Sequence, residues 1–135
     1  MSPLVDVGQV EGALVMGLGL HTTEEIKFNP TTGQKLAAGT WSYKPPSALD
    51  IPVDLRVTLL PNSSNESGVL RAKAVGEPPL CLSYGVVMAL RQAITAARSM
   101  AGESGWFDIR LPFTTAAKCQ QLLPIQMTIY LESLG

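Results

Sequence analysis

A glutamate lies between a glycine and two prolines in the segment Gly76-Glu77-Pro78-Pro79, and this arrangement could position a general base. A carboxylate can accept a proton in catalysis. Gly76 would let a substrate or cofactor approach the backbone, and the prolines restrict the chain beyond Glu77, so the carboxylate would have little conformational freedom. A second interpretation is electrostatic, because a carboxylate near a helix N-terminus gains about 0.3–1 kcal/mol from the helix dipole. Local chemistry alone favours this second interpretation.

The segment from residue 8 to residue 22 is predicted to be a helix with an unusual number of glycines. Small and apolar residues recur at spacings of three and four, which places them on one helical face; they are Val10, Ala13, Leu14, Gly17 and Leu18. An interior glycine costs a helix about 1 kcal/mol relative to alanine. Because the segment holds Gly8, Gly12, Gly17 and Gly19, its backbone is expected to approach either a neighbouring helix or a bound ligand closely.

A second helix is predicted from Pro79 to about Met100. A proline is tolerated in the first helical turn, where its missing N–H would be unpaired anyway. The predicted apolar stripe consists of Leu82, Val86, Ala89, Leu90, Ala93 and Ala97, and it leaves Arg91 and Arg98 to one side. Further on, Thr114 or Thr115 could cap a third helix that runs to about Leu123.

Between the first two helices, the pattern favours extended segments and turns. Residues 24–28 and 34–37 are predicted to form a hairpin around the turn Asn29-Pro30-Thr31-Thr32-Gly33. Residues 54–60 alternate like a half-buried strand, and residues 69–74 and 106–111 are also expected to be extended. The predicted fold class is therefore α+β, with two long helices, a hairpin and a few strands. So few strands do not make an independent sheet, which indicates part of a larger domain.

The composition is typical of a soluble globular protein. The chain has 135 residues, of which 46% are apolar and 16% charged, and its net charge is −1. This balance predicts neither a nucleic-acid partner nor attraction to an anionic membrane. The longest apolar run, residues 13–20, is shorter than the roughly 20 residues that a membrane span needs, so no membrane partner is expected.

The cysteines and the histidine give no sign of a metal site built by this chain. Cys81 and Cys119 lie far apart and form no cluster with histidine, so no protein ligands to a metal are expected. Both are expected to be reduced, mostly buried thiols of a cytoplasmic protein. No basic region opens the chain as in a secretory signal. His21 is expected to be a surface or packing residue rather than a ligand.

Four motifs together resemble the C-terminal part of the molybdenum hydroxylases, the aldehyde oxidase/xanthine dehydrogenase family. They are Asp6-Val7-Gly8-Gln9-Val10-Glu11-Gly12-Ala13 with Met16-Gly17-Leu18-Gly19; Thr40-Trp41-Ser42-Tyr43-Lys44-Pro45-Pro46; Asp50-Ile51-Pro52; and Ala74-Val75-Gly76-Glu77-Pro78-Pro79-Leu80. Their order and separations make the resemblance specific, and it covers about Asp6 to Trp106. It implies the C-terminal part of a molybdopterin-binding domain over residues 1–108 and a diverged tail over residues 109–135.

The resemblance also implies roles for individual residues. In this family the glutamate of the Gly-Glu-Pro motif is the active-site base, and Glu77 matches it. The glutamine of the Gly-Gln-x-Glu-Gly motif lies beside the molybdopterin, and Gln9 matches it. Gly76 and the glycines of the first predicted helix, Gly8, Gly12, Gly17 and Gly19, are expected to let the backbone approach the cofactor, whereas Glu11 is expected to be structural. No metal ligand is expected from this chain.

The resemblance also implies properties of a whole enzyme, of which this chain would be only a part. Such enzymes hydroxylate aldehydes or N-heterocycles with water-derived oxygen, and residues 32–57 favour an aldehyde oxidase over a xanthine dehydrogenase. The parent enzyme is expected to be a homodimer with 2Fe-2S clusters and FAD, whose sites are not recognisable here. The isolated segment is expected to be inactive, with exposed apolar helix faces. The alternative is a non-catalytic degenerate fragment or interaction module.

Overall fold

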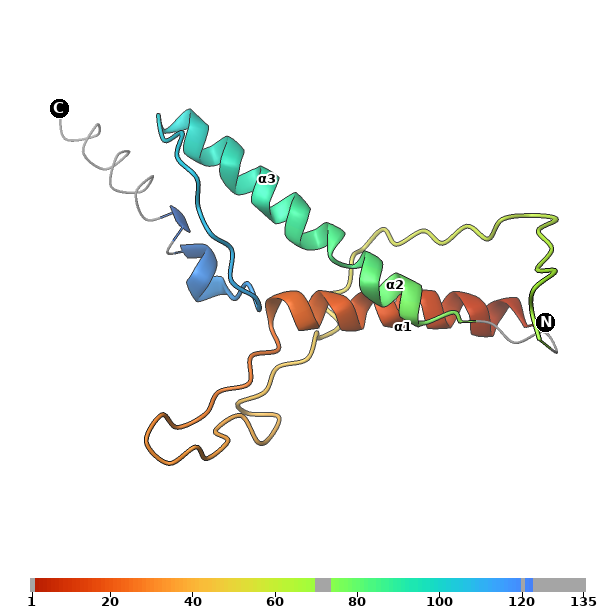
Figure 1. Cartoon of the computed structure of the whole chain (residues 1–135), viewed down its shortest axis with the longest axis horizontal. Coiled ribbons are helices and arrows are strands. Elements are labelled where there is room, and N and C mark those ends of the chain that lie inside the picture. The colour runs from red at the N-terminus through yellow and green to blue at the C-terminus, as the bar shows by residue number, and fades with distance from the viewer. Residues whose placement is uncertain (1, 70–73, 120, 123–135) are drawn as a thin grey trace.

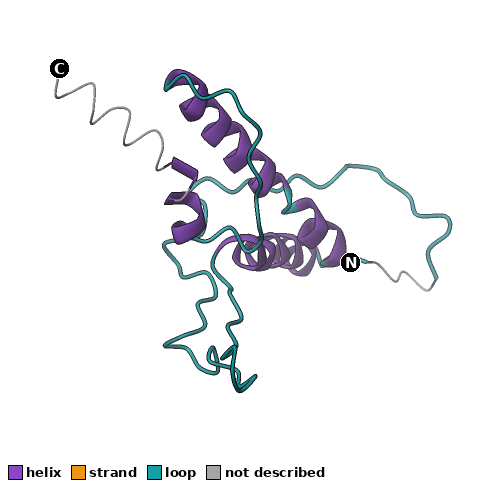
Figure 2. Cartoon of the chain, turned by 60° about the vertical axis from the view of Figure 1, so that its left-hand side comes forward, coloured by secondary structure: helices purple, strands orange, loops and turns teal. Residues whose placement is uncertain are grey.

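A computed structural model describes residues 2–69, 74–119 and 121–122, and helices are its main regular elements. Helix α1 spans Pro3–Thr22, α2 spans Glu77–Leu82 and α3 spans Gly85–Met100. Helix α2 lies across α1, and α3 continues away from that crossing (Figure 1). A long excursion of turns and extended chain connects α1 to α2 (Figure 2).

The predicted α+β fold class is wrong for the described residues, which contain no strand. Their backbone pairing of β type is a single antiparallel bridge between Phe28 and Lys35. The predicted strand at residues 54–60 is extended but unpaired, and so is the segment at residues 106–111. An extended segment becomes a strand only when its N–H and C=O groups bond to a neighbouring strand, and the described part of the chain offers none. Residues 70–73 of the segment predicted at 69–74 lie outside the described residues.

The hairpin turn, in contrast, lies where the sequence predicts it. The Asn29 side-chain oxygen accepts hydrogen bonds from the N–H groups of Thr31 and Thr32, at 2.8 and 3.1 Å. Gly33 has a φ of 70°, a conformation that favours glycine. Asparagine and glycine thus define the turn, although the chain on either side of it pairs too briefly to form strands.

Both long helices begin at other residues than predicted. Helix α1 begins at Pro3 rather than Gly8, with the proline in its first turn. The helix predicted from Pro79 to Met100 begins at Glu77 and is interrupted at Ser83 and Tyr84. At this interruption the Ser83 hydroxyl donates to the carbonyl of Leu80 at 2.5 Å.

Helix α1 meets the end of α2 at Gly17. A Cβ placed on Gly17 would lie 2.5 Å from the Cβ of Ser83 and 3.0 Å from the carbonyl oxygen of Leu80. Ser83 is only 1% exposed. The two helices can therefore come this close only because residue 17 has no side chain.

A small apolar core forms where α3 meets the chain that follows it. Ile94, Phe107 and Phe113 are buried together, and Leu90, Ile109, Ala117 and Leu122 pack against them. The predicted stripe is wrong in part, because its members Leu82, Ala89 and Ala93 are exposed, whereas Val87 and Ile94 are buried and Arg98 packs. The Arg91 guanidinium lies 4.0 Å from the centre of the Trp106 ring and Arg98 lies 5.3 Å from that of Phe107. Both arginines stack on aromatic rings and therefore lie on the packed face of α3. A prediction based only on the spacing of apolar residues misses them.

Residues 109–135 are predicted to be a tail that diverges from the family, and the first part of this tail packs on the helices. The Phe113 N–H donates to the carbonyl of His21 at 2.7 Å. His21 also contacts Tyr84 edge to face, as a packing residue should. Residues 115–119 are helical, and the Thr114 hydroxyl accepts from the Ala117 N–H at 3.4 Å, as predicted for a cap. The division at residue 108 stays a prediction, and residue 123, the predicted end of this helix, lies outside the described residues.

Much apolar surface stays exposed, as expected for both long helices. The chain exposes 10494 Å², whereas a compact monomer of its mass would expose about 6,800 Å². Large apolar side chains are exposed on both helices, among them Leu4, Val5, Met16, Leu20, Met88 and Met100.

The prediction that the two thiols are mostly buried is wrong, because Cys81 and Cys119 both lie on outer helical surfaces and are exposed.

Two helical stretches are long and apolar enough to cross a membrane by length and composition alone. They are Pro3–Thr22 and Glu77–Met100, and the second is the one that is interrupted at Ser83 and Tyr84. Helices that pack inside a larger protein pass the same test, so this is weak evidence for a membrane. The expectation that the chain has no membrane partner stays a prediction.

Residues 40–46 contact the chain at the end of α1. The Tyr43 hydroxyl donates a hydrogen bond to the carboxylate of Glu24, which raises the pKa of the Tyr43 phenol above its ordinary value. A Cβ on Gly19 would lie 2.5 Å from Cδ of Pro46. An open hollow of about 420 Å³ lies next to this contact and is lined by Ile26, Lys35, Ala37, Ala38, Gly39, Thr40, Tyr43 and Pro45.

We predict that Gly17→Ala destabilises the protein by about 1–3 kcal/mol, the usual cost of overpacking. The added methyl would push α1 away from Ser83. Thermal unfolding of Gly17→Ala should therefore show a lowered Tm, and adding Ser83→Gly should restore part of the loss. Gly85→Ala is the matched control, since a Cβ there meets nothing within 4 Å. Equal Tm values for the Gly17→Ala and Gly85→Ala variants would contradict this packing.

The Tyr43–Glu24 contact predicts that Tyr43 loses its proton at a higher pH than an ordinary tyrosine. A raised pKa means that the contact stabilises the fold below the ordinary tyrosine pKa, and that this contribution disappears as pH rises through the raised value. In an absorbance titration, Tyr43 should lose its proton at a pH above the ordinary tyrosine pKa. Glu24→Gln removes the carboxylate charge and should lower that pKa. An identical titration of the variant would show that the contact does not form.

Candidate functional site

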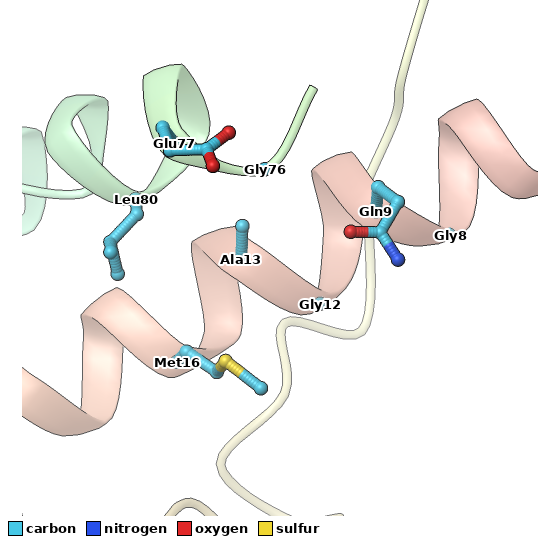
Figure 3. A pocket seen from close by; sticks show the side chains of 8 residues that line it. All are labelled: Gly8, Gln9, Gly12, Ala13, Met16, Gly76, Glu77 and Leu80. Atoms are coloured by element: carbon cyan, nitrogen blue, oxygen red, sulfur yellow. The ribbon is translucent and has the colours of Figure 1, made fainter. Parts of the chain in front are cut away.

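An open hollow of about 260 Å³ lies between α1 and α2. Helix α1 forms its floor, and the beginning of α2 forms one side (Figure 3). Its lining residues are Gly8, Gln9, Gly12, Ala13, Met16, Gly76, Glu77 and Leu80. The four residues predicted from sequence as site residues, Gly8, Gln9, Gly76 and Glu77, are thus brought together, although they come from two distant segments.

The two polar side chains of the hollow come from opposite helices. Gln9 is on the second turn of α1, and Glu77 is the first residue of α2 (Figure 3). Both are exposed, and neither has a hydrogen-bond partner within the described part of the chain. The Gln9 amide can donate and accept, and an ionised Glu77 can only accept. Their hydrogen-bonding groups are therefore free to bind a ligand.

Gly76 brings the backbone before α2 close to Gln9. A Cβ on Gly76 would lie 3.4 Å from Oε1 of Gln9, which is ordinary contact distance. Gly76 precedes the helix with a φ of −83°, so no unusual backbone angle requires glycine here. Its lack of a side chain keeps the space between the Gln9 amide and the start of α2 open.

The glycines of α1 separate into two pairs with different surroundings. Neighbouring residues fill the space beside Gly17 and Gly19, because a Cβ on either would collide with Ser83 or Pro46. Gly8 and Gly12 line the hollow, and a Cβ on either meets nothing within 4 Å. Gly17 and Gly19 thus pack against neighbouring segments instead of facing a ligand, whereas Gly8 and Gly12 have open space beside them.

Three lining residues were missed by sequence reasoning: Ala13, Met16 and Leu80. Helical spacing could have found them, since residues 8, 12 and 16 lie on one face of α1, and Leu80 follows Glu77 by one turn of α2. Glu11 does not line the hollow. No group of three His, Cys, Asp or Glu side chains that could hold a metal ion occurs among residues 2–69, 74–119 and 121–122.

Comparison with known proteins gives consistent matches. Residues 1–52 match a family model described as "Molybdopterin cofactor-binding domain". The chain is 43% identical over 114 residues to a xanthine dehydrogenase of Dictyostelium discoideum, which covers 84% of the chain and 8% of that protein. It is 41% identical over 120 residues to xanthine dehydrogenase 2 of Arabidopsis thaliana (84% and 9%). It is also 44% identical over 104 residues to a xanthine dehydrogenase/oxidase of Mus musculus (77% and 8%).

These relatives do not support the sequence-based preference for an aldehyde oxidase. Those named above are all xanthine dehydrogenases, and the chain spans less than a tenth of the length of each.

Proposed function

Because the chain belongs to the molybdenum hydroxylase family, we propose that it supplies one wall of a molybdopterin site and the general base that acts there. One observation carries this proposal. The four residues that the family motifs single out line a common hollow, although they lie at the two ends of a long stretch of chain.

The residues of the hollow fit part of such a cofactor site. Gly8 and Gly12 leave space that a Cβ would fill, so a flat polar molecule could rest directly on α1. The unpartnered Gln9 amide offers a donor and an acceptor without charge. Gln9, Gly8 and Gly76 would then hold the edge of a molybdopterin. When bound, the molybdenum cofactor supplies the two-electron oxidation that places water-derived oxygen on a substrate carbon.

Glu77 is the group of this chain that would handle the proton. Its carboxylate is exposed to the hollow and bonds to no other described residue, so it is available to accept a proton from the reacting centre. The backbone on the C-terminal side of Glu77 limits its movement, because Pro78 and Pro79 follow it in the first turn of α2. This is the rigid placement that efficient general-base catalysis requires.

The substrate proposal follows the relatives. Because their names refer to xanthine, we propose an N-heterocycle rather than an aldehyde as the preferred substrate class. The remaining cofactors, 2Fe-2S clusters and FAD, belong to parts of the parent enzyme outside this chain. The exposed helix faces would pack against those parts, which accounts for the small core of the segment by itself. We propose that the parent enzyme is cytoplasmic and dimeric.

The test uses a chimera, in which this chain replaces the matching stretch of the Dictyostelium xanthine dehydrogenase. The chimera should bind molybdopterin and oxidise xanthine. Glu77→Gln should lower its turnover by at least about 100-fold, the scale expected for a general base, while molybdopterin content stays the same. Glu66→Gln, on an exposed loop, is the matched control. Turnover within a few fold of the unmodified chimera would refute the role of Glu77, and a chimera that folds without molybdopterin would refute the assigned site.

A further inference from the structure

Ser83 is a buried polar residue at the interruption between α2 and α3. Its side chain is only 1% exposed and lies against the backbone of α1 at Gly17. A buried hydroxyl destabilises a protein unless it forms a hydrogen bond, and alanine would fill nearly the same space without a polar atom. Packing against Gly17 therefore accounts for a small residue at position 83, but it does not account for a hydroxyl.

The Ser83 hydroxyl replaces a backbone hydrogen bond that the interruption removes. In a continuous helix the Tyr84 N–H would bond to the carbonyl of Leu80, but it bonds to that of Cys81 at 3.2 Å. The Ser83 hydroxyl donates to the Leu80 carbonyl instead, at 2.5 Å. This carbonyl is turned toward α1, since its oxygen would lie 3.0 Å from a Cβ on Gly17. The hydroxyl thus satisfies an acceptor that faces a neighbouring helix.

Helix α2 connects this buried end to the proposed base. Backbone hydrogen bonds from Leu80 to Gly76, at 3.2 Å, and from Ser83 to Pro79, at 3.0 Å, span the helix. Helix α2 has 6 residues, so Ser83 lies about 9 Å beyond Glu77 along the axis. If α2 turned about Ser83 by about 6°, the backbone of Glu77 would shift by about 1 Å. A misplacement of about 1 Å can lower a rate on the order of 100-fold.

We infer that Ser83 is a positioning residue for the general base, because its hydrogen bond to Leu80 holds α2 at the angle to α1 that directs Glu77 into the hollow. This inference rests on the proposed function, which makes Glu77 the base. The other explanation is that Ser83 only packs, so that its hydroxyl contributes to stability alone. The place of Leu80 favours a positioning role, since Leu80 follows Glu77 by one helical turn and itself lines the hollow (Figure 3).

The experiment measures Ser83→Ala in the chimeric enzyme, with Thr22→Val as the matched control. Thr22 is also buried, and its hydroxyl donates to the carbonyl of Leu18 at 2.6 Å, but it lies at the C-terminal end of α1, outside the hollow. Both variants lose a buried hydroxyl that bonds to a helix carbonyl, so both should lower the Tm. Only Ser83→Ala should lower kcat, by about tenfold, with KM and molybdopterin content changed by less than about twofold.

Two double variants separate positioning from packing. Ser83→Ala added to Glu77→Gln should lower kcat by less than about a further twofold, because a base that is absent cannot also be misplaced. Gly17→Ala/Ser83→Gly supplies a methyl group from α1 where the hydroxyl was. It should recover part of the lost Tm and keep a kcat about tenfold low, since the Leu80 carbonyl still lacks its donor.

Three results would overturn the inference. The first is an unchanged kcat in Ser83→Ala. The second is an equal fall in kcat with and without Glu77→Gln, which would show that the hydroxyl does not act through the base. The third is recovery of kcat together with Tm in Gly17→Ala/Ser83→Gly, which would show that packing is sufficient. None of these affects the proposed function, which fails separately if Glu77→Gln alone leaves turnover unchanged or if the unmodified chimera folds without molybdopterin.

Discussion

The close contact between α1 and the end of α2 determines where every residue of the candidate site lies. Gly17 has no side chain, so Ser83 can be buried against the backbone of α1. This contact places the start of α2 beside Gln9 and Gly12, about two helical turns before Gly17 on α1. Glu77 and Gln9 then face the same hollow from different helices.

The chain combines a well-defined site wall with little core of its own. Its buried apolar residues are few, and large side chains on α1 and α3 face outward. A segment that spans less than a tenth of its relatives is expected to show such surfaces, since the elements that cover them in a complete domain come from elsewhere in the protein. The same reasoning applies to the hollow. Helix α1 and α2 form a floor and one side, and a pocket that excludes water needs further walls, which other parts of the parent enzyme would provide.

The sequence indicated which residues would lie together better than it indicated the fold, for physical reasons. Gln9 and Glu77 were singled out through the resemblance of their motifs to a known family, since local chemistry alone favoured a helix-end role for Glu77; both line the same hollow, and their roles stay predictions. The strand at residues 54–60 was predicted wrongly because alternation shows only that a segment could pair, and its partner is not among the described residues. The packed face of α3 was misjudged because Arg91 and Arg98 pack through their guanidinium planes. The glycines of α1 could not be divided into a packed pair and an open pair until Ser83 and Pro46 were placed in space.

The central claim is that the hollow between α1 and α2 is part of a molybdopterin site. The most direct measurement is a crystal structure of the chimeric holoenzyme. The account predicts electron density for the molybdopterin in this hollow, within contact distance of Gly8, Gln9, Gly76 and Glu77. Protein side chains filling the hollow, or a cofactor bound away from these four residues, would contradict it.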